Sequence, residues 1–405
     1  MLVMIFSLVF CVFAQDISWD VHKEVLHDGV RLYIHRVPDT KMVSVMFRYH
    51  LPDDIPDGAA HFVEHLMFSY RKEGRTYDQI LEQMGGTSQG QTDLAMMKLS
   101  VHIPIESWGD WVQLEKNRHE SLCINIEENI FEAQRMVIVQ EYIQGLALEE
   151  RSYAQELRTA IFGEGKNGQS VIGSIDDISD WEHIQICTYM RQIKAQVPID
   201  IFIVGDTGAI DVANDIRTIF SKHRREKILA NKQEVRPPVQ IEHTGRNESL
   251  FVLWPIPSLR HVDTLPLRYW MMMMTHTRFG VLQRNGIQAR GWIEYGFQGG
   301  YLLLHLQGKR VHELEHSLRA HMYGLGGWMT LWNHSSLVSK VYRRSVVHSW
   351  KTLDGRLSWL EYCEGAGVLS SCFEQQYVLP LRKLDAAKKH WLRWEQGSIV
   401  RVVSP

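Results

Sequence analysis

The segment from Ala59 to Phe68 is the feature that most restricts how this chain can fold. It reads AAHFVEHLMF, and every residue in it is apolar except His61, Glu64 and His65. Such a segment favours a helix that is buried on most sides, and a buried carboxylate costs several kcal/mol unless it is paired, hydrogen-bonded or bound to a metal. Because successive helical residues are about 100° apart, the three ionisable side chains project within one arc roughly 100° wide. The segment therefore predicts a buried helix that carries a site.

The residue types and their spacing favour zinc at this site. Two imidazoles at positions i and i+4 suit a tetrahedral zinc ion, and a carboxylate beside them can reach a water on the metal. With 20 histidines in 405 residues, the pattern HxxEH is expected by chance only roughly 0.06 times per chain. This chain contains the pattern twice, so the two copies have to be distinguished by their surroundings.

The second copy lies in the sequence HELEH and consists of His312, Glu315 and His316. The apolar residues around it, among them Val311 and Leu314, follow one helical stripe, while both histidines lie to one side among charged residues. This pattern is typical of an amphipathic helix with a solvated face. We therefore expect the first copy, and not the second, to bind a metal.

A zinc site on the first copy needs a third protein ligand. A long helix is expected over residues 131–160, with a break near Gly145, and Glu141 continues one of its apolar faces. On spacing alone, the neighbouring Glu127, Glu128 and Glu132 remain alternatives.

The order of strand and helix signals divides the chain into two parts. Residues 15–222 begin with strand patterns and continue with helices. A stretch rich in Lys, Arg and Asn then ends in two prolines, and the signals start again after it. We take residues 223–240 as a linker and residues 241–405 as a second domain, a division that 405 residues can support.

Several local patterns predict individual elements. Apolar and polar side chains alternate over residues 95–103, which predicts a strand with one buried face. Thr76 and Gln79 can form a capping box for a helix that ends near Gly85. Four consecutive methionines, residues 271–274, lie in a helical pattern and are expected to fill a core rather than bind a soft metal.

The N-terminus and the charge bear on where the protein acts. Residues 1–14 are almost entirely apolar and end in a suitable signal-peptidase site. We therefore expect a cleaved signal peptide and a secreted or periplasmic protein, with an uncleaved anchor as the alternative. The net charge of −3 gives no basic surplus for nucleic acid or an anionic membrane. The four later cysteines do not amount to a disulfide scaffold.

These motifs resemble those of the pitrilysin and insulinase family of zinc metallopeptidases, which carry an inverted HxxEH motif. The resemblance lies in DGAAHFVEHLMF (57–68), GGTSQGQT (85–92) and RMVIVQE (135–141), and it covers most of residues 20–220. It implies an α+β fold of two similar domains, each a mostly antiparallel sheet with helices packed on one face. Together the two domains would form half of a pitrilysin-type clamshell.

Carried over to this sequence, the resemblance implies that His61, His65 and Glu141 bind one Zn2+ ion per chain and that Glu64 is the catalytic base. Glu64 would take the proton of a zinc-bound water as that water attacks a peptide bond. The function implied is that of an exported zinc endopeptidase acting on peptides or small unfolded proteins.

The resemblance also concerns residues around the ligands. Substrate would bind as an added strand near Gln89 and Gly90. Gln134 stands where the family often has a supporting Glu, so this chain lacks a charge beside the ligands. In the second half, Ala289 stands near the expected substrate-binding Tyr, and we interpret Arg284 as a surface residue.

Family members enclose substrate between two such halves, so the resemblance implies a partner. This partner would be a zinc-free paralogue in a heterodimer or a second copy in a homodimer. Two alternatives for the function remain: a low-activity or non-catalytic subunit of such a heterodimer, and a dedicated processing protease for one peptide precursor. No nucleic acid and, after signal cleavage, no membrane is expected as a partner.

Overall fold

The computed structural model describes the chain except for residues 1–19, 27–28, 122, 124–125, 147–148, 164, 222, 224–233, 278–279, 297–298, 324–339, 342–343, 368 and 370–380. The expected signal peptide and most of the expected linker lie outside the described residues. Within the described part of the chain, no helix is both long enough and apolar enough to cross a membrane.

The first half of the chain is built on a six-stranded sheet in the order β1-β2-β8-β3-β7-β6. Only β2 and β8 run parallel, and the other neighbours are antiparallel. The strands are β1 (His22–Val25), β2 (Val30–Arg36), β3 (Met42–His50), β6 (Thr87–Thr92), β7 (Met96–Pro104) and β8 (Ile199–Gly205). The order places β6 at one edge of the sheet.

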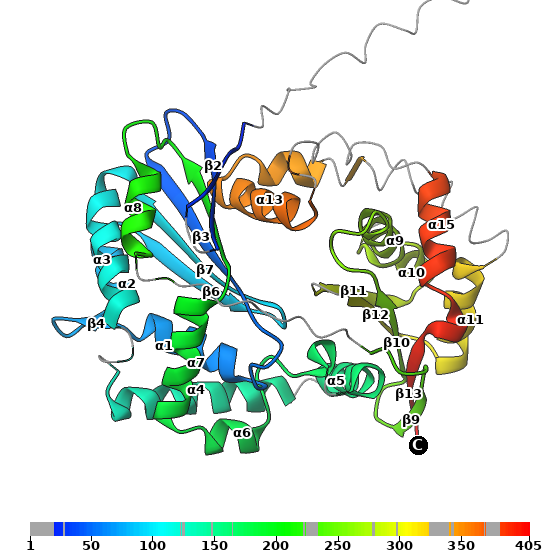
Figure 1. Cartoon of the computed structure of the whole chain (residues 1–405). Coiled ribbons are helices and arrows are strands. Elements are labelled where there is room, and N and C mark those ends of the chain that lie inside the picture. The colour runs from blue at the N-terminus through cyan, green and yellow to red at the C-terminus, as the bar shows by residue number, and fades with distance from the viewer. Residues whose placement is uncertain are drawn as a thin grey trace, which may run out of the picture.

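Helices cover one face of this sheet (Figure 1). They are α1 (Ala59–Phe68), α2 (Tyr77–Gln83), α3 (Trp108–Ser121), α4 (Glu128–Leu146), α6 (Ile175–Asp180), α7 (His183–Gln196) and α8 (Val212–Ile219), and a short hairpin of β4 (Arg71–Lys72) and β5 (Arg75–Thr76) precedes α2. Phe62 of α1 and Trp111 of α3 pack into one apolar core with alternate residues of the strands, such as Phe47 and Leu99.

The second half repeats this plan with a five-stranded sheet in the order β11-β12-β10-β13-β9. Its strands are β9 (Gln240–Thr244), β10 (Ser249–Ile256), β11 (Gln288–Tyr295), β12 (Gly300–Gln307) and β13 (Ser398–Val403). Its helices are α9 (Thr264–Thr275), α10 (Val281–Arg284), α11 (Val311–Met322) and α15 (Leu381–Trp391). Again only one pair, β13 and β9, runs parallel. The structure therefore confirms the predicted α+β fold with two similar, mostly antiparallel sheets.

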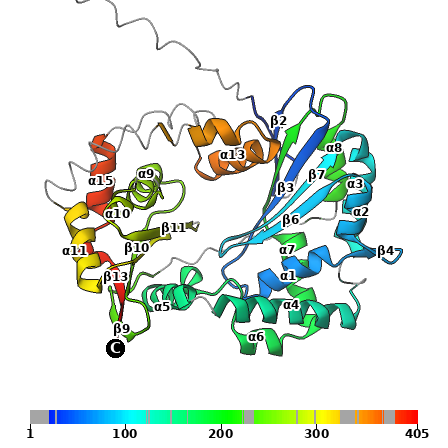
Figure 2. The same ribbon diagram turned by 180° about the vertical axis from the view of Figure 1, so that it is seen from behind.

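Each half also sends one helix to the other sheet (Figures 1 and 2), which the prediction of helices on one face did not include. Helix α5 (Glu149–Phe162) follows α4 and packs with Leu157 and Ile161 in an apolar cluster on the second sheet. Helix α13 (Leu353–Gly365) places Leu357 and Leu360 against the opposite face of the first sheet. The exchange joins the two halves through two further apolar clusters.

Buried ion pairs reinforce the contact of α13 with the first sheet. Arg48 on β3 is 2% exposed and bonds to Asp200 on β8 and to Glu361 on α13. Burial acts to raise the pKa of the Asp200 carboxyl, but a hydrogen bond with His50 and the charges of Arg48 and Arg31 hold that pKa well below its usual range. Such a network leaves an uncompensated buried charge when one partner is removed.

Most local predictions are confirmed. Both hydrogen bonds of the capping box between Thr76 and Gln79 are present. One face of β7 is buried, as the alternation over residues 95–103 predicted. The described residues of the predicted long helix form α4, up to Leu146, and α5, from Glu149, and the two residues between them lie outside the described part of the chain. Three of the four methionines in α9 are buried in the core of the second half.

A disulfide joins Cys123, just after α3, to Cys187 in α7, with 5.7 Å between the Cα atoms. The sequence did not indicate this pair, because the spacing of four cysteines does not identify partners. The bond ties together two helices of the layer that supports α1.

Candidate metal centre

Helix α1 is placed by its apolar side. Phe62, Val63 and Leu66 are buried in the first core, which turns His61 and His65 toward the opposite side of the helix. These two imidazoles remain 16% and 15% exposed.

Helix α4 crosses α1 and determines which acidic residue reaches the histidines. Phe131 of α4 stacks on Phe62 of α1, with 4.8 Å between the ring centroids. Ile138, two turns further on, is buried in the same core. Because Glu141 follows Ile138 by three residues, this packing brings its carboxylate to α1.

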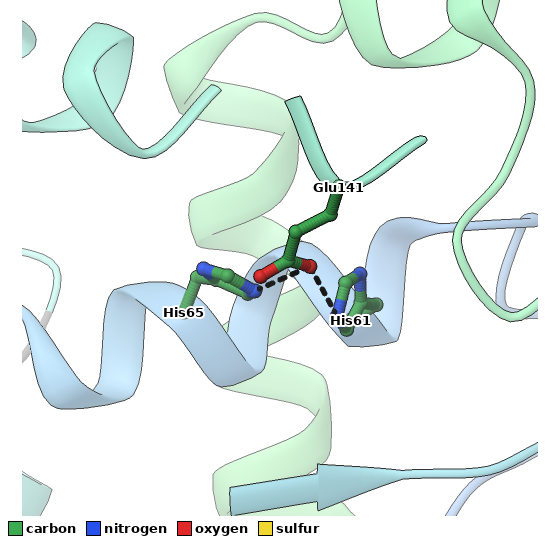
Figure 3. A group of neighbouring side chains, drawn as sticks. All are labelled: His61, His65 and Glu141. Carbon is green, nitrogen blue, oxygen red and sulfur yellow. Dashed lines mark ion pairs between the residues drawn. The ribbon is translucent and has the colours of Figure 1, made fainter. Parts of the chain in front are cut away.

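Figure 3 shows the Glu141 carboxylate between the two imidazoles. Its Oε2 atom lies 3.6 Å from Nε2 of His61 and 3.6 Å from Nε2 of His65. One ligand atom from each of the three residues falls within 4.8 Å of the others. No other trio of His, Cys, Asp or Glu residues in the described part of the chain meets this condition.

The other acidic candidates on this stretch have different neighbours. Glu128 pairs with His183 at 3.2 Å, and Glu132 pairs with Arg135 at 2.9 Å. Among the glutamates that spacing allowed as the third ligand, only Glu141 lies close enough to His61 and His65 to share a metal ion with them in the described part of the chain.

The two histidines are suited to bind a cation. Burial, together with the neighbouring His65, lowers the pKa of His61 to about 4, so this imidazole is neutral at physiological pH. Its Nδ1 atom is buried and has no hydrogen-bond partner among the described residues. On His65, Nδ1 lies 3.2 Å from Oε1 of Gln134. If Nδ1 donates its proton there, the lone pair of Nε2 is left facing Glu141.

Glu64 lies on the same side of α1, against the edge strand β6. Burial raises the pKa of its carboxyl, while a hydrogen bond from Thr92 and the charge of His65 act in the opposite direction. A Cβ at Gly90 would overlap the Glu64 carboxylate and the ring of Phe68, so any larger residue there would displace these side chains. Thr92 was not among the predicted site residues. The period-two pattern of β6 could have placed it on the same face as Gly90.

A cavity of about 580 Å3 opens beside Glu64 and His65. It lies between α1, β6 and α4, and its lining includes Phe68, Gln89, Gly90, Ala133 and Gln134. The residues predicted to contact substrate and to support His65 therefore border one space next to the histidine pair.

The second HxxEH copy has different surroundings. His312 and His316 are exposed on α11, whose apolar stripe is buried. The carboxylate of Glu315 accepts hydrogen bonds from Arg401 at 3.0 Å and from Arg319 at 2.9 Å. The predicted amphipathic helix is confirmed, and its carboxylate is already paired.

The substrate contacts expected in the second half are not located. Arg284 is exposed at the end of α10, as a surface residue should be, and Ala289 is buried in β11.

Comparison with known proteins shows what the segment that carries this site is similar to. Residues 52–174, which contain α1, β6 and α4, match the model of the insulinase family, peptidase family M16. This part of the chain is therefore similar to an M16 peptidase domain. No curated protein sequence matches the chain significantly.

Solved structures share the fold over nearly the whole chain. A protease from Helicobacter pylori has a TM-score of 0.82 at 15% identity, and the match covers 95% of this chain and 99% of that one. A peptidase M16 inactive domain from Pseudomonas fluorescens has a TM-score of 0.79 at 12% identity, and the match covers 95% of this chain and 98% of that one. The periplasmic protease PqqL from Escherichia coli gives 0.68 at 15% identity, covering 95% of this chain and 48% of PqqL. The fold that the chain shares with these structures therefore extends beyond residues 52–174, into the second sheet.

Proposed function

We propose that this protein is a zinc-dependent endopeptidase that hydrolyses peptides or small unfolded proteins. The observation that carries the proposal is the convergence of His61, His65 and Glu141 from two helices, directly beside the carboxylate of Glu64. The M16 match of the segment that contains all four residues supports it.

The three candidate ligands fit zinc. Two imidazoles and one carboxylate are a donor set of catalytic zinc sites. The separations of 3.6 Å between the nitrogen and oxygen atoms suit a small ion whose bonds to each are about 2 Å long. When bound, zinc acts as a Lewis acid that polarises a carbonyl group and makes water more acidic.

Glu64 would act as the general base. Its carboxylate would take the proton of the attacking water and then deliver it to the leaving amine, which completes the hydrolysis of one peptide bond. Burial raises the pKa of Glu64 and so makes it a stronger base than an exposed carboxylate.

The peptide would lie extended along β6. This strand is at the edge of its sheet, so a peptide can add to the sheet through main-chain hydrogen bonds. Gln89 and Gly90 would then face the substrate, and the adjoining cavity would accept one of its side chains. Main-chain recognition of this kind tolerates many sequences.

We further propose that the protein is exported and acts with a second half of the same fold. The apolar N-terminus and the disulfide between Cys123 and Cys187 support an oxidising compartment. The chain spans 48% of PqqL, which is described as a periplasmic protease. A zinc-free paralogue or a second copy of this chain would supply the other half.

One observation favours a second candidate function, a low-activity or non-catalytic subunit. Gln134 offers His65 a neutral amide oxygen, and a carboxylate there would increase the basicity of the ligand. One structural neighbour is described as an inactive domain.

Zinc content and peptide cleavage distinguish the two functions. The full chain should be purified from its source with any bound partner, and also recombinantly alone, and assayed with an unstructured fluorogenic peptide. The endopeptidase function predicts one zinc ion per chain and cleavage that a chelator abolishes. Stoichiometric zinc without cleavage in either preparation would instead favour the non-catalytic subunit.

A further inference from the structure

The hairpin formed by β6 and β7 connects the candidate base to the second half of the chain. Strand β6 lies beside α1, and the hairpin extends from the first sheet toward the second sheet in both views (Figures 1 and 2). Its turn, residues 93–95, joins Thr92 to Met96. Strand β6 of this hairpin contacts Glu64, and the turn at its end reaches the second half of the chain.

At the first end, β6 holds the Glu64 carboxylate from two sides. Alternate residues of β6 are exposed, and the others, Ser88, Gly90 and Thr92, are partly buried. Gly90 presents bare backbone to one carboxylate oxygen, because any Cβ would overlap it. Thr92 donates a hydrogen bond from its Oγ1 atom to the other oxygen, Oε2.

The turn that follows is fixed by its own hydrogen bonds. One oxygen of the Asp93 carboxylate accepts hydrogen bonds from the amides of Ala95, at 3.0 Å, and Met96, at 2.8 Å. The carbonyl of Ala95 in turn accepts a hydrogen bond from the amide of Leu51 at 2.9 Å. These hydrogen bonds bracket Leu94, the residue at the tip of the turn, and hold the short segment that joins it to Thr92.

At the second end, the tip is anchored in the other half. Leu94 is 5% exposed and belongs to the apolar cluster that contains Phe162 of α5 and Tyr301 and Leu303 of β12. This cluster is formed on the second sheet. The position of the hairpin thus depends on residues that lie far from the metal centre in the sequence.

We propose that Leu94 and Thr92 are positioning residues through which the second half holds the base. Leu94 fixes the hairpin on the second sheet, and Thr92 uses this fixed position to keep the Glu64 carboxylate in one place. The inference rests on the proposed function, in which Glu64 takes a proton from water. A misplacement of a catalytic group by about 1 Å can cost roughly 100-fold in rate, so this contact matters for turnover rather than for metal binding.

The first experiment separates turnover from binding. Thr92→Val removes the hydroxyl and keeps the shape, and Thr92→Ser keeps the hydroxyl. Because a hydrogen bond to a charged group is lost, we expect Thr92→Val to lower kcat roughly 10- to 100-fold, with KM and zinc content unchanged. Thr92→Ser should restore most of kcat. An unchanged kcat in Thr92→Val, or a rise in KM alone, would overturn the proposal.

The second experiment tests the anchor. Leu94→Ala should lower kcat by about tenfold, and in the background of Thr92→Val it should add little, because contacts in one path are not additive. If the two losses of kcat were fully additive, the proposal that Leu94 acts through Thr92 would be overturned. Two matched controls should leave kcat unchanged when measured below their unfolding temperatures: Thr244→Val, exposed on the edge strand β9, and Leu304→Ala, buried on β12 in a different cluster.

Crystal structures of the zinc-free full chain give a readout that does not depend on activity. We expect the Glu64 carboxylate to lie against β6 in the wild type and in Thr92→Ser, and to leave this place in Thr92→Val. If it stays in place in Thr92→Val, the positioning role is overturned even for an active enzyme. If it moves but the wild type cleaves no peptide, the positioning role stands and the proposed function fails.

Discussion

Helices α1 and α11 carry the same five-residue pattern, yet only one of them forms a candidate metal centre. In α1, the histidines are mostly buried and α4 brings a carboxylate between them. In α11, the histidines are exposed, and the neighbouring strand β13 brings the guanidinium of Arg401 to Glu315. The element packed beside each copy thus supplies an anion in one case and a cation in the other.

This difference shows that the motif fixes where two imidazoles and a carboxylate point, and that the neighbouring element decides what they can bind. A cation has to replace its hydration shell with several ligands at once, and two exposed histidines do not provide them. A guanidinium next to the same carboxylate neutralises it and repels a metal ion.

The largest expected difference between the two copies is in metal binding. His65→Ala should abolish stoichiometric zinc, because it leaves one imidazole and one carboxylate. His316→Ala, the matched change in α11, should retain one zinc ion per chain. Elemental analysis of the purified variants measures this, and loss of zinc in His316→Ala would mean that the second copy is the site.

The next difference is in turnover. Glu64→Gln should lower kcat/KM by roughly 100- to 10,000-fold with zinc retained, since the base is lost while the candidate ligands persist. Glu315→Gln removes the corresponding carboxylate from α11 and should leave activity near the wild-type value. Kinetics with an unstructured peptide, together with zinc analysis, tests the pair. Comparable losses of kcat/KM in Glu64→Gln and Glu315→Gln would show that the two copies of the motif do not differ in their importance for turnover.

A smaller difference is expected in the pH dependence of the metal-free chain. The His61 imidazole takes up a proton near pH 6.5 when unfolded, and at about pH 4 when folded. The unfolded state therefore binds more protons between these values, and the free energy of unfolding falls as the pH drops through this window, by roughly 3 kcal/mol from this group. Denaturant titrations at several pH values should show that the free energy of unfolding depends less on pH in His61→Gln than in the wild type. An equal pH dependence in His61→Gln and in the wild type would contradict the expectation.

The smallest effect concerns the support of His65. Gln134→Glu should raise zinc affinity about 10- to 100-fold, because a carboxylate at Nδ1 makes the imidazole a stronger ligand. Gln140→Glu, on the exposed face of the same helix, adds the same charge without this contact. Competition with a zinc chelator measures both affinities. An equal gain in both variants would show that general charge, and not the contact with His65, is responsible.

Local patterns in the sequence predicted a large part of the fold. The amphipathic helix expected around His312 and His316 is α11, and the capping box at Thr76 begins α2 as expected. These features depend on residues within a few positions of one another, so periodicity and capping describe them well.

Contacts between distant residues were not predictable. The ion pair between Arg48 and Glu361 joins positions 313 residues apart. The pairing of Cys123 with Cys187 and the hydrogen bond from Thr92 to Glu64 likewise follow from how helices and strands pack. No local pattern records these choices, since they depend on the register of one element against another.

By itself, the sequence determined that His61, Glu64 and His65 project together from an apolar helix, because helical geometry and hydrophobic burial act over ten neighbouring residues. It left several glutamates as candidates for the third ligand, and it gave the same motif to α11. Only the tertiary structure decided between them. The packing of Phe131 on Phe62 sets the register of α4 on α1, and this register alone brings Glu141, rather than Glu128 or Glu132, to the two imidazoles.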